Sequence, residues 1–388
     1  MKKLKILQIC YSYPPSFSGY GKQLQTVNTA LLSADSDIDI TLLTAFDRDR
    51  HRSAFDREHS VAVDAVLHDS RSAYGERRSL LVFSLFLLFR KVSAFLNADV
   101  VHVVKADLEA VVSVLLAKLL RKRVVVKITH READEERCKK SGYRRFIAFF
   151  IARADMVVAT SGAIRNDLVS LGLGEERIVE IPNSVDTGRY NVLAEEERQR
   201  KRTKLTGLPG SVFTLLYAAT ISKRKGVDDL LDALDKLESG REIAVFMIGS
   251  DNGEIADFKQ RVELLNARGN GISVRYLGFQ QSALDYLHIA DALVLPSHSE
   301  GMPNIVLESL SCGVPVIASD IEVHRRLVGE RSGMTFRTGN AGDLGRKIAL
   351  MAETCYDPAG IRAEVVNRYS VQSVAERYRE LYRTLADK

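Results

Sequence analysis

Short apolar runs alternate with helical patterns along this 388-residue chain, and that alternation limits its fold more than any other feature. The runs contain almost no polar residues, which is typical of parallel strands buried on both faces. In the first half, strands are predicted at residues 5–9, 38–44, 100–104, 124–128, 156–159 and 178–181. In the second half, they are predicted at 214–218, 243–248, 274–277, 292–295 and 314–318. Because helical patterns fill the gaps, we expect an α/β protein with two doubly wound parallel sheets.

The chain is too long for one ordinary core, so its length predicts two domains. A polar stretch rich in Glu, Arg and Lys, residues 186–210, marks the expected junction. We therefore expect a first domain at 1–186, a second at 187–370 and a closing helix at 371–388. Both domains should be Rossmann-like and face a cleft, with ligands at the carboxyl ends of the strands.

The net charge and the cysteines indicate which partners the protein can bind and in which compartment it is expected. A net charge of +5 suits anionic ligands or a membrane surface, and no basic patch interleaved with aromatic residues predicts nucleic-acid binding. The four cysteines have no metal or redox spacing, which is typical of a reducing compartment. The amino terminus runs into a predicted strand without a signal-peptide pattern, so a cytoplasmic location is expected.

One apolar segment, residues 80–89, is bracketed by basic residues but is shorter than the ~20 residues that cross a bilayer. Two interpretations stay open: a buried helix of the first domain, or an interfacial helix whose flanking cations snorkel toward lipid headgroups. Residues 139–153, with a basic start and an apolar body, form a second candidate. An anionic membrane surface is therefore one expected partner, with the protein peripheral on the inner face of the membrane.

Two carboxylates, Glu300 and Glu308, are separated by seven residues between two predicted strands. A short helix is predicted to begin there, near Pro303. Its first turn would present unpaired backbone N–H groups, and such a helix end is a ready anion site. These N–H groups belong to Asn304, Ile305 and Val306.

Glu300 would lie on the loop that leaves a strand, where open α/β sheets bind ligands, and Glu308 about one turn inside the helix. Solvated helix-end glutamates are the simpler interpretation of an arbitrary pair. The whole segment, however, resembles the Glu, seven residues, Glu signature of the retaining glycosyltransferases of the glycogen synthase-like class. This class, also called glycosyltransferase family four or glycosyl transferases group one, has two Rossmann-like domains in the GT-B fold.

The resemblance implies a role for each carboxylate and for the end of the chain. In that family the second Glu binds the ribose hydroxyls of a nucleotide sugar, which implies this role for Glu308. The first Glu contacts the donor sugar at the reacting face, which implies a catalytic role for Glu300. By the same analogy the closing helix should pack back on the first domain.

Lys225, which follows a predicted strand, resembles the lysine of the family's Lys-Gly element, which holds the donor diphosphate. The Gly-Arg pair that usually precedes this lysine is replaced by Ala219 and Thr220. Three consequences stay open: the Thr220 hydroxyl and the helix N-terminus bind phosphate, a neighbouring cation does so, or the donor site is weakened.

Two further strand ends of the second half match the family. Gly249 ends a strand where the missing side chain would let the backbone approach a ligand. Leu277 and Phe279 follow the next strand, in the loop that frames the nucleobase in the family. Ordinary strand-end packing is the alternative for both side chains.

The first half is less specific. Gly19, after the first predicted strand, resembles part of the family's Gly-Gly loop, which closes over the diphosphate and the donor sugar. Gly19 and Gly21 also begin a dinucleotide-binding pattern, with Asp47 after the second strand. We discount that pattern because the loop is too long and Leu24 stands where a third Gly is needed.

His130, just past a buried strand, matches the family's active-site His, which contacts the donor sugar; a structural His is the alternative. Asp47 and Asp49 have the Asp-x-Asp form that metal-dependent glycosyltransferases use, but a solvated loop explains them more simply. No metal site and no cofactor are therefore expected.

The sequence thus predicts a retaining, metal-independent glycosyltransferase that moves a sugar from a UDP- or GDP-sugar to a hydroxyl acceptor. The acceptor is expected to be a surface glycan or a lipid-linked glycan, bound by the first domain. Two alternatives stay open: a nucleotide-sugar epimerase on the same fold, and an inactive nucleotide-sugar-binding subunit of a transferase complex.

Overall fold

The computed structural model describes residues 3–14, 18–34, 37–46, 62–67, 75–129, 141–251 and 255–387. The chain divides into two compact units. Unit 1 comprises Met1–Ser184 and Val371–Lys388, and unit 2 comprises Val185–Ser370. The first boundary therefore falls after Ser184 rather than after Asp186, and the last helix belongs to unit 1.

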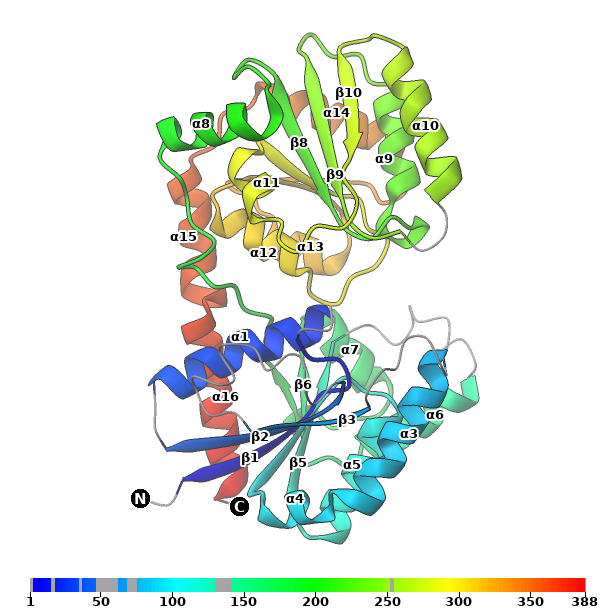
Figure 1. Ribbon diagram of the computed structural model, residues 1–388, viewed down its shortest axis with the longest axis vertical. Coiled ribbons are helices and arrows are strands. Elements are labelled where there is room, and N and C mark those ends of the chain that lie inside the picture. The colour runs from blue at the N-terminus through cyan, green and yellow to red at the C-terminus, as the bar shows by residue number, and fades with distance from the viewer. Residues whose placement is uncertain are drawn as a thin grey trace. The chain divides into compact units, whose positions relative to one another are not determined.

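Unit 1 contains a parallel sheet of seven strands in the order β3-β2-β1-β4-β5-β6-β7 (Figure 1). The strands are β1 (Leu4–Ile9), β2 (Ile38–Phe46), β3 (Ala62–Leu67), β4 (Val100–Val104), β5 (Arg123–Ile128), β6 (Met156–Ala159) and β7 (Ile178–Glu180). The helices are α1 (Gly19–Ala34), α3 (Gly75–Arg90), α4 (Val92–Asn97), α5 (Leu108–Leu119), α6 (Ser141–Ile151), α7 (Gly162–Ser170) and α16 (Val371–Ala386).

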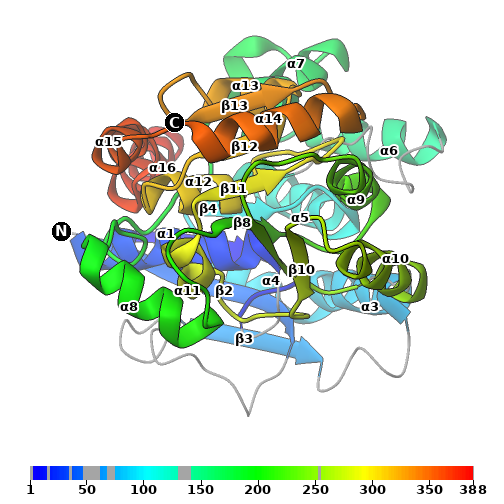
Figure 2. The same ribbon diagram turned by 90° about the horizontal axis from the view of Figure 1, so that it is seen from above.

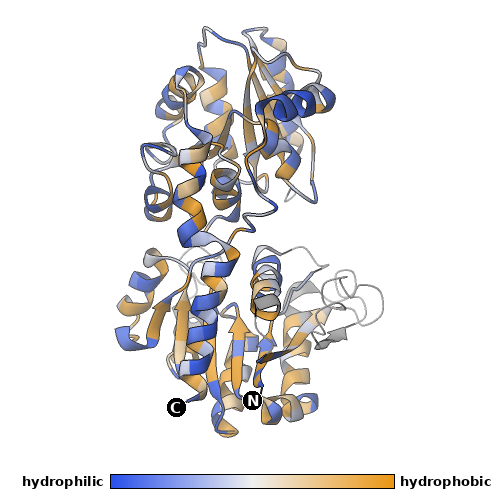
Figure 3. Cartoon of the chain, turned by 90° about the vertical axis from the view of Figure 1, so that its left-hand side faces the viewer, coloured by the Kyte–Doolittle hydropathy of each residue, from blue (hydrophilic) through white to orange (hydrophobic). Residues whose placement is uncertain are grey.

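Helices cover both faces of this sheet, which explains why its strands are apolar on both sides. On β5, Val124 and Val126 belong to the core that α3, α5 and α6 complete, whereas Val125 belongs to the core under α1 and α16. Figure 3 shows the strands mostly in the hydrophobic colour, while the helices alternate between hydrophobic and hydrophilic faces.

The last helix, α16, lies beside α1 and completes one of these two cores (Figure 1 and Figure 2). Its Tyr382 hydroxyl lies 2.7 Å from Nδ1 of His102 on β4. Burial and then the nearby Lys127 lower the pKa of His102 to about 3, so the imidazole is neutral. A helix from the end of the sequence is thus bonded to the middle of the unit 1 sheet.

Unit 2 contains a second parallel sheet, with six strands in the order β10-β9-β8-β11-β12-β13. The strands are β8 (Phe213–Ala218), β9 (Ile243–Ile248), β10 (Ile272–Tyr276), β11 (Ala292–Leu295), β12 (Val316–Ser319) and β13 (Gly333–Phe336). The helices are α8 (Glu195–Thr206), α9 (Val227–Asp235), α10 (Ile255–Ala267), α11 (Leu284–Ile289), α12 (Asn304–Ser311), α13 (Glu322–Leu327), α14 (Ala341–Glu353) and α15 (Pro358–Tyr369).

The expectation of two doubly wound, Rossmann-like parallel sheets is confirmed. The outermost strands β3 and β13 were not predicted. β13 has only four residues and begins with Gly333, so it lacks the apolar run that identifies the inner strands. None of the helices within the described ranges combines the length and the apolar character needed to cross a membrane.

Candidate active site at the strand ends of unit 2

The carboxyl ends of β8 and β11 lie side by side where the strand order of unit 2 reverses. From β8 the sheet continues to β9 and β10 on one side, and from β11 to β12 and β13 on the other. In open α/β sheets, ligands bind outside the strand ends at such a reversal, which is called the switch point. The loop after β8 carries Thr220 and Lys225, and the loop after β11 carries Glu300. The fold therefore brings predicted site residues from two distant segments to one edge of the sheet.

Lys225 and Glu300 form an ion pair, with 2.5 Å between Nζ and Oε1. The two side chains are only 16% and 9% exposed. Burial alone would raise the pKa of Glu300, but the Lys225 ammonium group more than offsets it, so this pKa lies below its ordinary value. Glu300 is therefore ionised at neutral pH, and the strand ends hold one fixed carboxylate against one fixed ammonium group.

Three further contacts join the loop after β11 to the loop and helix after β8. The His298 backbone N–H donates to the Arg224 carbonyl at 2.9 Å, and the Arg224 guanidinium donates to the Ser299 carbonyl at 2.8 Å. The His298 imidazole lies 2.8 Å from a carboxylate oxygen of Asp229 in α9. The two loops therefore form one bonded assembly around the ion pair.

Two glycines allow the backbone to pack this closely. Gly226 has a φ of +69°, and a Cβ added there would lie 2.0 Å from the Pro296 carbonyl oxygen. Gly249 has a φ of +153°, and an added Cβ would lie 1.9 Å from the Ala219 carbonyl oxygen. We expected the space beside Gly249 to admit a ligand, but the Ala219 backbone fills it.

The first turn of α12 differs in part from the prediction. Pro303 caps the helix without a side-chain hydrogen bond, and Asn304 and Ile305 are its first two residues. The Val306 N–H, expected to be unpaired, donates to the Pro303 carbonyl at 3.2 Å. The helix therefore begins with a tight turn, in which this N–H bonds to a carbonyl three residues earlier. The residue types alone did not predict this hydrogen bond.

Glu308 is partly buried in α12 and is hydrogen-bonded to the Tyr190 hydroxyl. Burial raises the pKa of Tyr190, and the Glu308 carboxylate raises it further, so the phenol stays protonated and donates to the carboxylate. Tyr190 was not predicted as a site residue, because nothing in its neighbouring sequence indicates a contact with Glu308. The exposed fraction of Tyr190 is 3%.

The two residues predicted to contact a base both follow β10, but their surroundings differ. The Leu277 N–H donates to the Met247 carbonyl at 2.9 Å, and its side chain packs against the core, as in ordinary strand-end packing. Phe279 remains 46% exposed. Of the two, Phe279 has the ring surface that a planar base could cover.

In unit 1, Gly19 is the exposed first residue of α1. The close backbone approach occurs instead at Gly21, in the first turn of α1, where an added Cβ would lie 2.2 Å from the Ser12 carbonyl oxygen. His130, predicted to contact the donor sugar, lies outside the described residues, as do Asp47 and Asp49. Among the described residues, no group of three or more His, Cys, Asp and Glu side chains is arranged to hold a metal ion.

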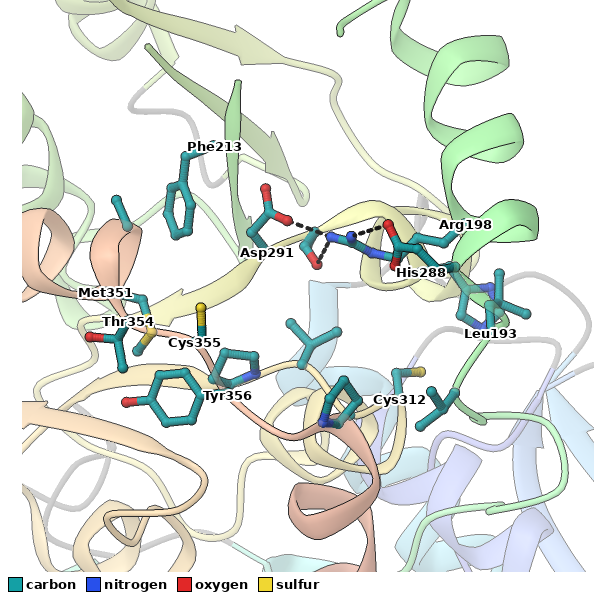
Figure 4. A pocket seen from close by; sticks show the side chains of 18 of the residues that line it. Leu193, Arg198, Phe213, His288, Asp291, Cys312, Met351, Thr354, Cys355 and Tyr356 are labelled. Atoms are coloured by element: carbon teal, nitrogen blue, oxygen red, sulfur yellow. Dashed lines mark hydrogen bonds and ion pairs between the residues drawn. The ribbon is translucent and has the colours of Figure 1, made fainter. Parts of the chain in front are cut away.

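Unit 2 also contains a pocket of about 700 Å³ at the amino-terminal edge of its sheet (Figure 4). Phe213 begins β8 and Asp291 directly precedes β11, so the pocket lies at the opposite strand ends from Lys225 and Glu300. The Asp291 carboxylate is bound by Arg198 at 2.5 Å and by the Thr214 N–H at 2.7 Å. The charges of Asp291 and Arg198 in this pocket are therefore paired with each other, and we do not assign the predicted donor to this pocket.

Two units of Rossmann-like parallel sheet, with a switch-point site in the second, place the protein in the GT-B structural class. Residues 24–189 match Glycosyltransferase Family 4, and residues 198–355 match Glycosyl transferases group 1. The chain belongs to the GT-B glycosyltransferases of this group 1 and family 4 type.

Several known proteins are similar to this chain. Alpha-galactosylglucosyldiacylglycerol synthase of Streptococcus pneumoniae is 26% identical over 47% of this chain and 48% of its own length. Glycogen synthase of Mycobacterium tuberculosis is 25% identical over 82% and 78%. The crystal structure of Anabaena HepE with UDP and glucose superposes with a TM-score of 0.79 at 18% identity, covering 98% of this chain and 100% of that one. The chain spans about half the length of some of the curated relatives that it matches.

The packing of the two loops can be tested at Gly226. Gly226→Ala should destabilise unit 2 through the positive φ, by about 1 kcal/mol, and through the clash with Pro296, by a further ~1–3 kcal/mol. Gly207→Ala is a matched control, because Gly207 has a φ of +70° but nothing within 4 Å of an added Cβ. Urea unfolding measures both variants, and equal losses of stability would show that the contact with Pro296 is not a close one.

Proposed function

We propose that this protein transfers a sugar from a nucleotide diphosphate sugar to a hydroxyl group, with retention of configuration at the sugar carbon. The observation that carries the proposal is the buried Lys225–Glu300 pair at the switch point of unit 2, with Glu308 in the helix that follows. The acceptor is a glycan or a lipid-linked glycan in polysaccharide or glycolipid synthesis. One similar protein supports this class of acceptor, because it is an N-acetylgalactosaminyltransferase of Campylobacter jejuni that acts on a diphospho-undecaprenol glycan.

The chemistry of the leaving group explains why a fixed cation is needed. Breaking the bond between sugar and phosphate leaves negative charge on the diphosphate, and preorganised cations and N–H groups stabilise that charge. Lys225 supplies the cation, and Thr220 with the backbone N–H groups of Asn304 and Ile305 supplies further donors.

The remaining predicted residues bind the other parts of the donor. Glu308 accepts hydrogen bonds from the ribose hydroxyls, and Phe279 and Leu277 contact the base of a UDP- or GDP-sugar. Glu300 and His130 contact the donor sugar at the reacting face. The donor is a substrate of the reaction, and we propose no separate cofactor.

The decisive experiment exposes the protein to a panel of UDP- and GDP-sugars and records thermal stabilisation and released nucleotide. Nucleotide release that depends on an added glycan or lipid-linked acceptor supports transfer. Conversion of the donor to an epimer without acceptor would identify an epimerase. Stabilisation without any turnover would identify an inactive binding subunit.

Glu308→Ala should abolish donor binding, because it removes charge-assisted hydrogen bonds to the ribose. Glu300→Ala should instead lower turnover more than donor affinity. Calorimetric titration with the active donor, combined with initial rates, separates the two effects. Glu330→Ala, which removes an exposed carboxylate of unit 2, is the control. Normal donor binding by Glu308→Ala would show that the ribose lies elsewhere.

Lys225→Ala should lower turnover by ~10² or more, the range found when one donor to a developing oxyanion is removed. Lys223→Ala, in the same loop but exposed, should stay close to wild type. Full activity in excess EDTA is expected, because Lys225 does the work that a metal would otherwise do. Activity that vanishes with EDTA and returns with manganese would overturn this assignment and implicate Asp47 and Asp49.

We also propose that the protein is peripheral on the inner face of a membrane, bound through unit 1. Neighbouring helices of this unit expose large apolar side chains, as an interfacial surface does. They are Leu81, Val82, Leu85, Leu88 and Phe89 on α3, Leu96 on α4, Leu115 and Leu119 on α5, and Phe146 and Phe149 on α6. Exposed cations lie at helix ends nearby, among them Arg90, Arg121 and Arg153, and suit anionic lipid headgroups.

Flotation with liposomes tests this surface. Binding to anionic vesicles should exceed binding to neutral vesicles and should fade as salt rises. The double variant Phe89→Glu and Leu119→Glu should lose most of the binding, because both side chains are highly exposed, at 73% and 79%. Leu264→Glu is the control, since Leu264 is 61% exposed in unit 2. Equal binding to anionic and neutral vesicles at low salt would rule the proposal out.

A further inference from the structure

A buried histidine, His324, contacts the strand next to β11. It belongs to α13 and its exposed fraction is 0%. Its Nδ1 atom lies 3.0 Å from the carbonyl oxygen of Ser319 and 3.1 Å from the hydroxyl oxygen of the same residue. Ser319 is the last residue of β12, so the imidazole closes onto the carboxyl end of that strand.

These contacts determine which nitrogen carries the proton. A carbonyl oxygen can only accept a hydrogen bond, so Nδ1 of His324 must be the donor. Burial lowers the pKa of His324 to about 4 although Glu300 acts in the opposite sense, so the ring is neutral at pH 7. Nε2 then has no proton, and within the described part of the chain it has no hydrogen-bond partner. The imidazole therefore acts through Nδ1.

The Ser319 hydroxyl extends this contact to the neighbouring loop. It donates its single proton to the Ser297 carbonyl at 2.5 Å, which leaves its lone pairs to accept from His324. Ser297 and Ser319 are both fully buried. The single imidazole N–H is therefore shared between the carbonyl and the hydroxyl of Ser319, and the hydroxyl continues the chain to the backbone of the loop after β11.

Ser297 stands three positions before Glu300 in the same loop. On the other side of that loop, Arg224 binds the Ser299 carbonyl, and its own carbonyl accepts from the His298 N–H. The loop is therefore held from two directions. One set of bonds comes from the loop after β8, and the other comes from β12 and α13.

We propose that His324 is a positioning residue for Glu300. Acting through Ser319 and the Ser297 carbonyl, it holds the loop so that the Glu300 carboxylate stays against Lys225 in the geometry that the reaction uses. The effect on turnover rests on the proposed function, whereas the hydrogen-bond chain itself does not.

Four variants test the proposal. His324→Asn keeps an N–H close to the Nδ1 position, His324→Gln places its amide near the Nε2 position instead, and His324→Phe keeps a ring without any donor. Ser319→Ala breaks the middle of the chain. We expect His324→Phe, His324→Gln and Ser319→Ala to lower kcat by about tenfold to 10², the size of effect that a small misplacement of a reacting group produces. Donor KM should change little, and His324→Asn should recover most of kcat.

Thermal melting of each variant separates positioning from folding. If His324→Phe does not fold, the comparison of His324→Asn with Ser319→Ala still decides the matter. The proposal is overturned if His324→Asn melts like wild type yet loses as much kcat as His324→Gln or Ser319→Ala. It is also overturned if these variants lose stability without any fall in kcat.

Nitrogen-15 NMR of the histidines provides a test without any donor. The signal that disappears in His324→Asn should have the shifts of an Nδ1–H tautomer, should not titrate down to pH 5, and should move in Ser319→Ala. An Nε2–H tautomer would overturn the hydrogen-bond chain. A wild-type protein that releases no nucleotide from any donor would overturn the proposed function instead. The NMR result would still show whether the hydrogen-bond chain from His324 to Ser297 exists.

Discussion

The parallel alignment of the strands in unit 2 is the constraint on which the candidate site depends. Parallel strands buried on both faces send all their carboxyl ends to one edge, and the order of the strands decides which loops meet there. The reversal between β8 and β11 brings the loop with Lys225 against the loop with Glu300, although these residues are far apart in the sequence. Two buried charges at such an edge are stable only as a pair, and the close backbone contact at Gly226 permits that pairing.

Much of this arrangement could be predicted because it is encoded locally. Inner strands have continuous apolar runs, so their positions and the doubly wound fold follow from the sequence. Lys225 and Glu300 follow recognisable strand ends, and their motifs resemble those of a known family. The short edge strand β13 has no such run and was missed. The close approach at Gly249 was predicted, but the group that approaches is the protein's own Ala219 carbonyl.

The supporting residues could not be predicted, because their roles depend on contacts between distant segments. Tyr190 and Glu308 are hydrogen-bonded across unit 2, and neither residue signals this in its own neighbourhood. His324 and Ser297 are linked through Ser319, after two strands have paired. The Val306 N–H was assigned to a ligand because helix starts leave such groups unpaired, and only the observed turn shows that Pro303 takes it.

The placement of α16 has a consequence for the order in which the protein folds. Unit 2 is continuous in sequence, whereas unit 1 is assembled from segments on both sides of it. Synthesis on a ribosome proceeds from the amino end, so every residue of unit 2 has been made before α16 is complete. Until α16 arrives, one face of the first sheet lacks Tyr378 and Tyr382, and apolar surface there is open to chaperones and proteases. The inserted unit can therefore reach its native state first, and the unit that begins the chain is the last to be finished.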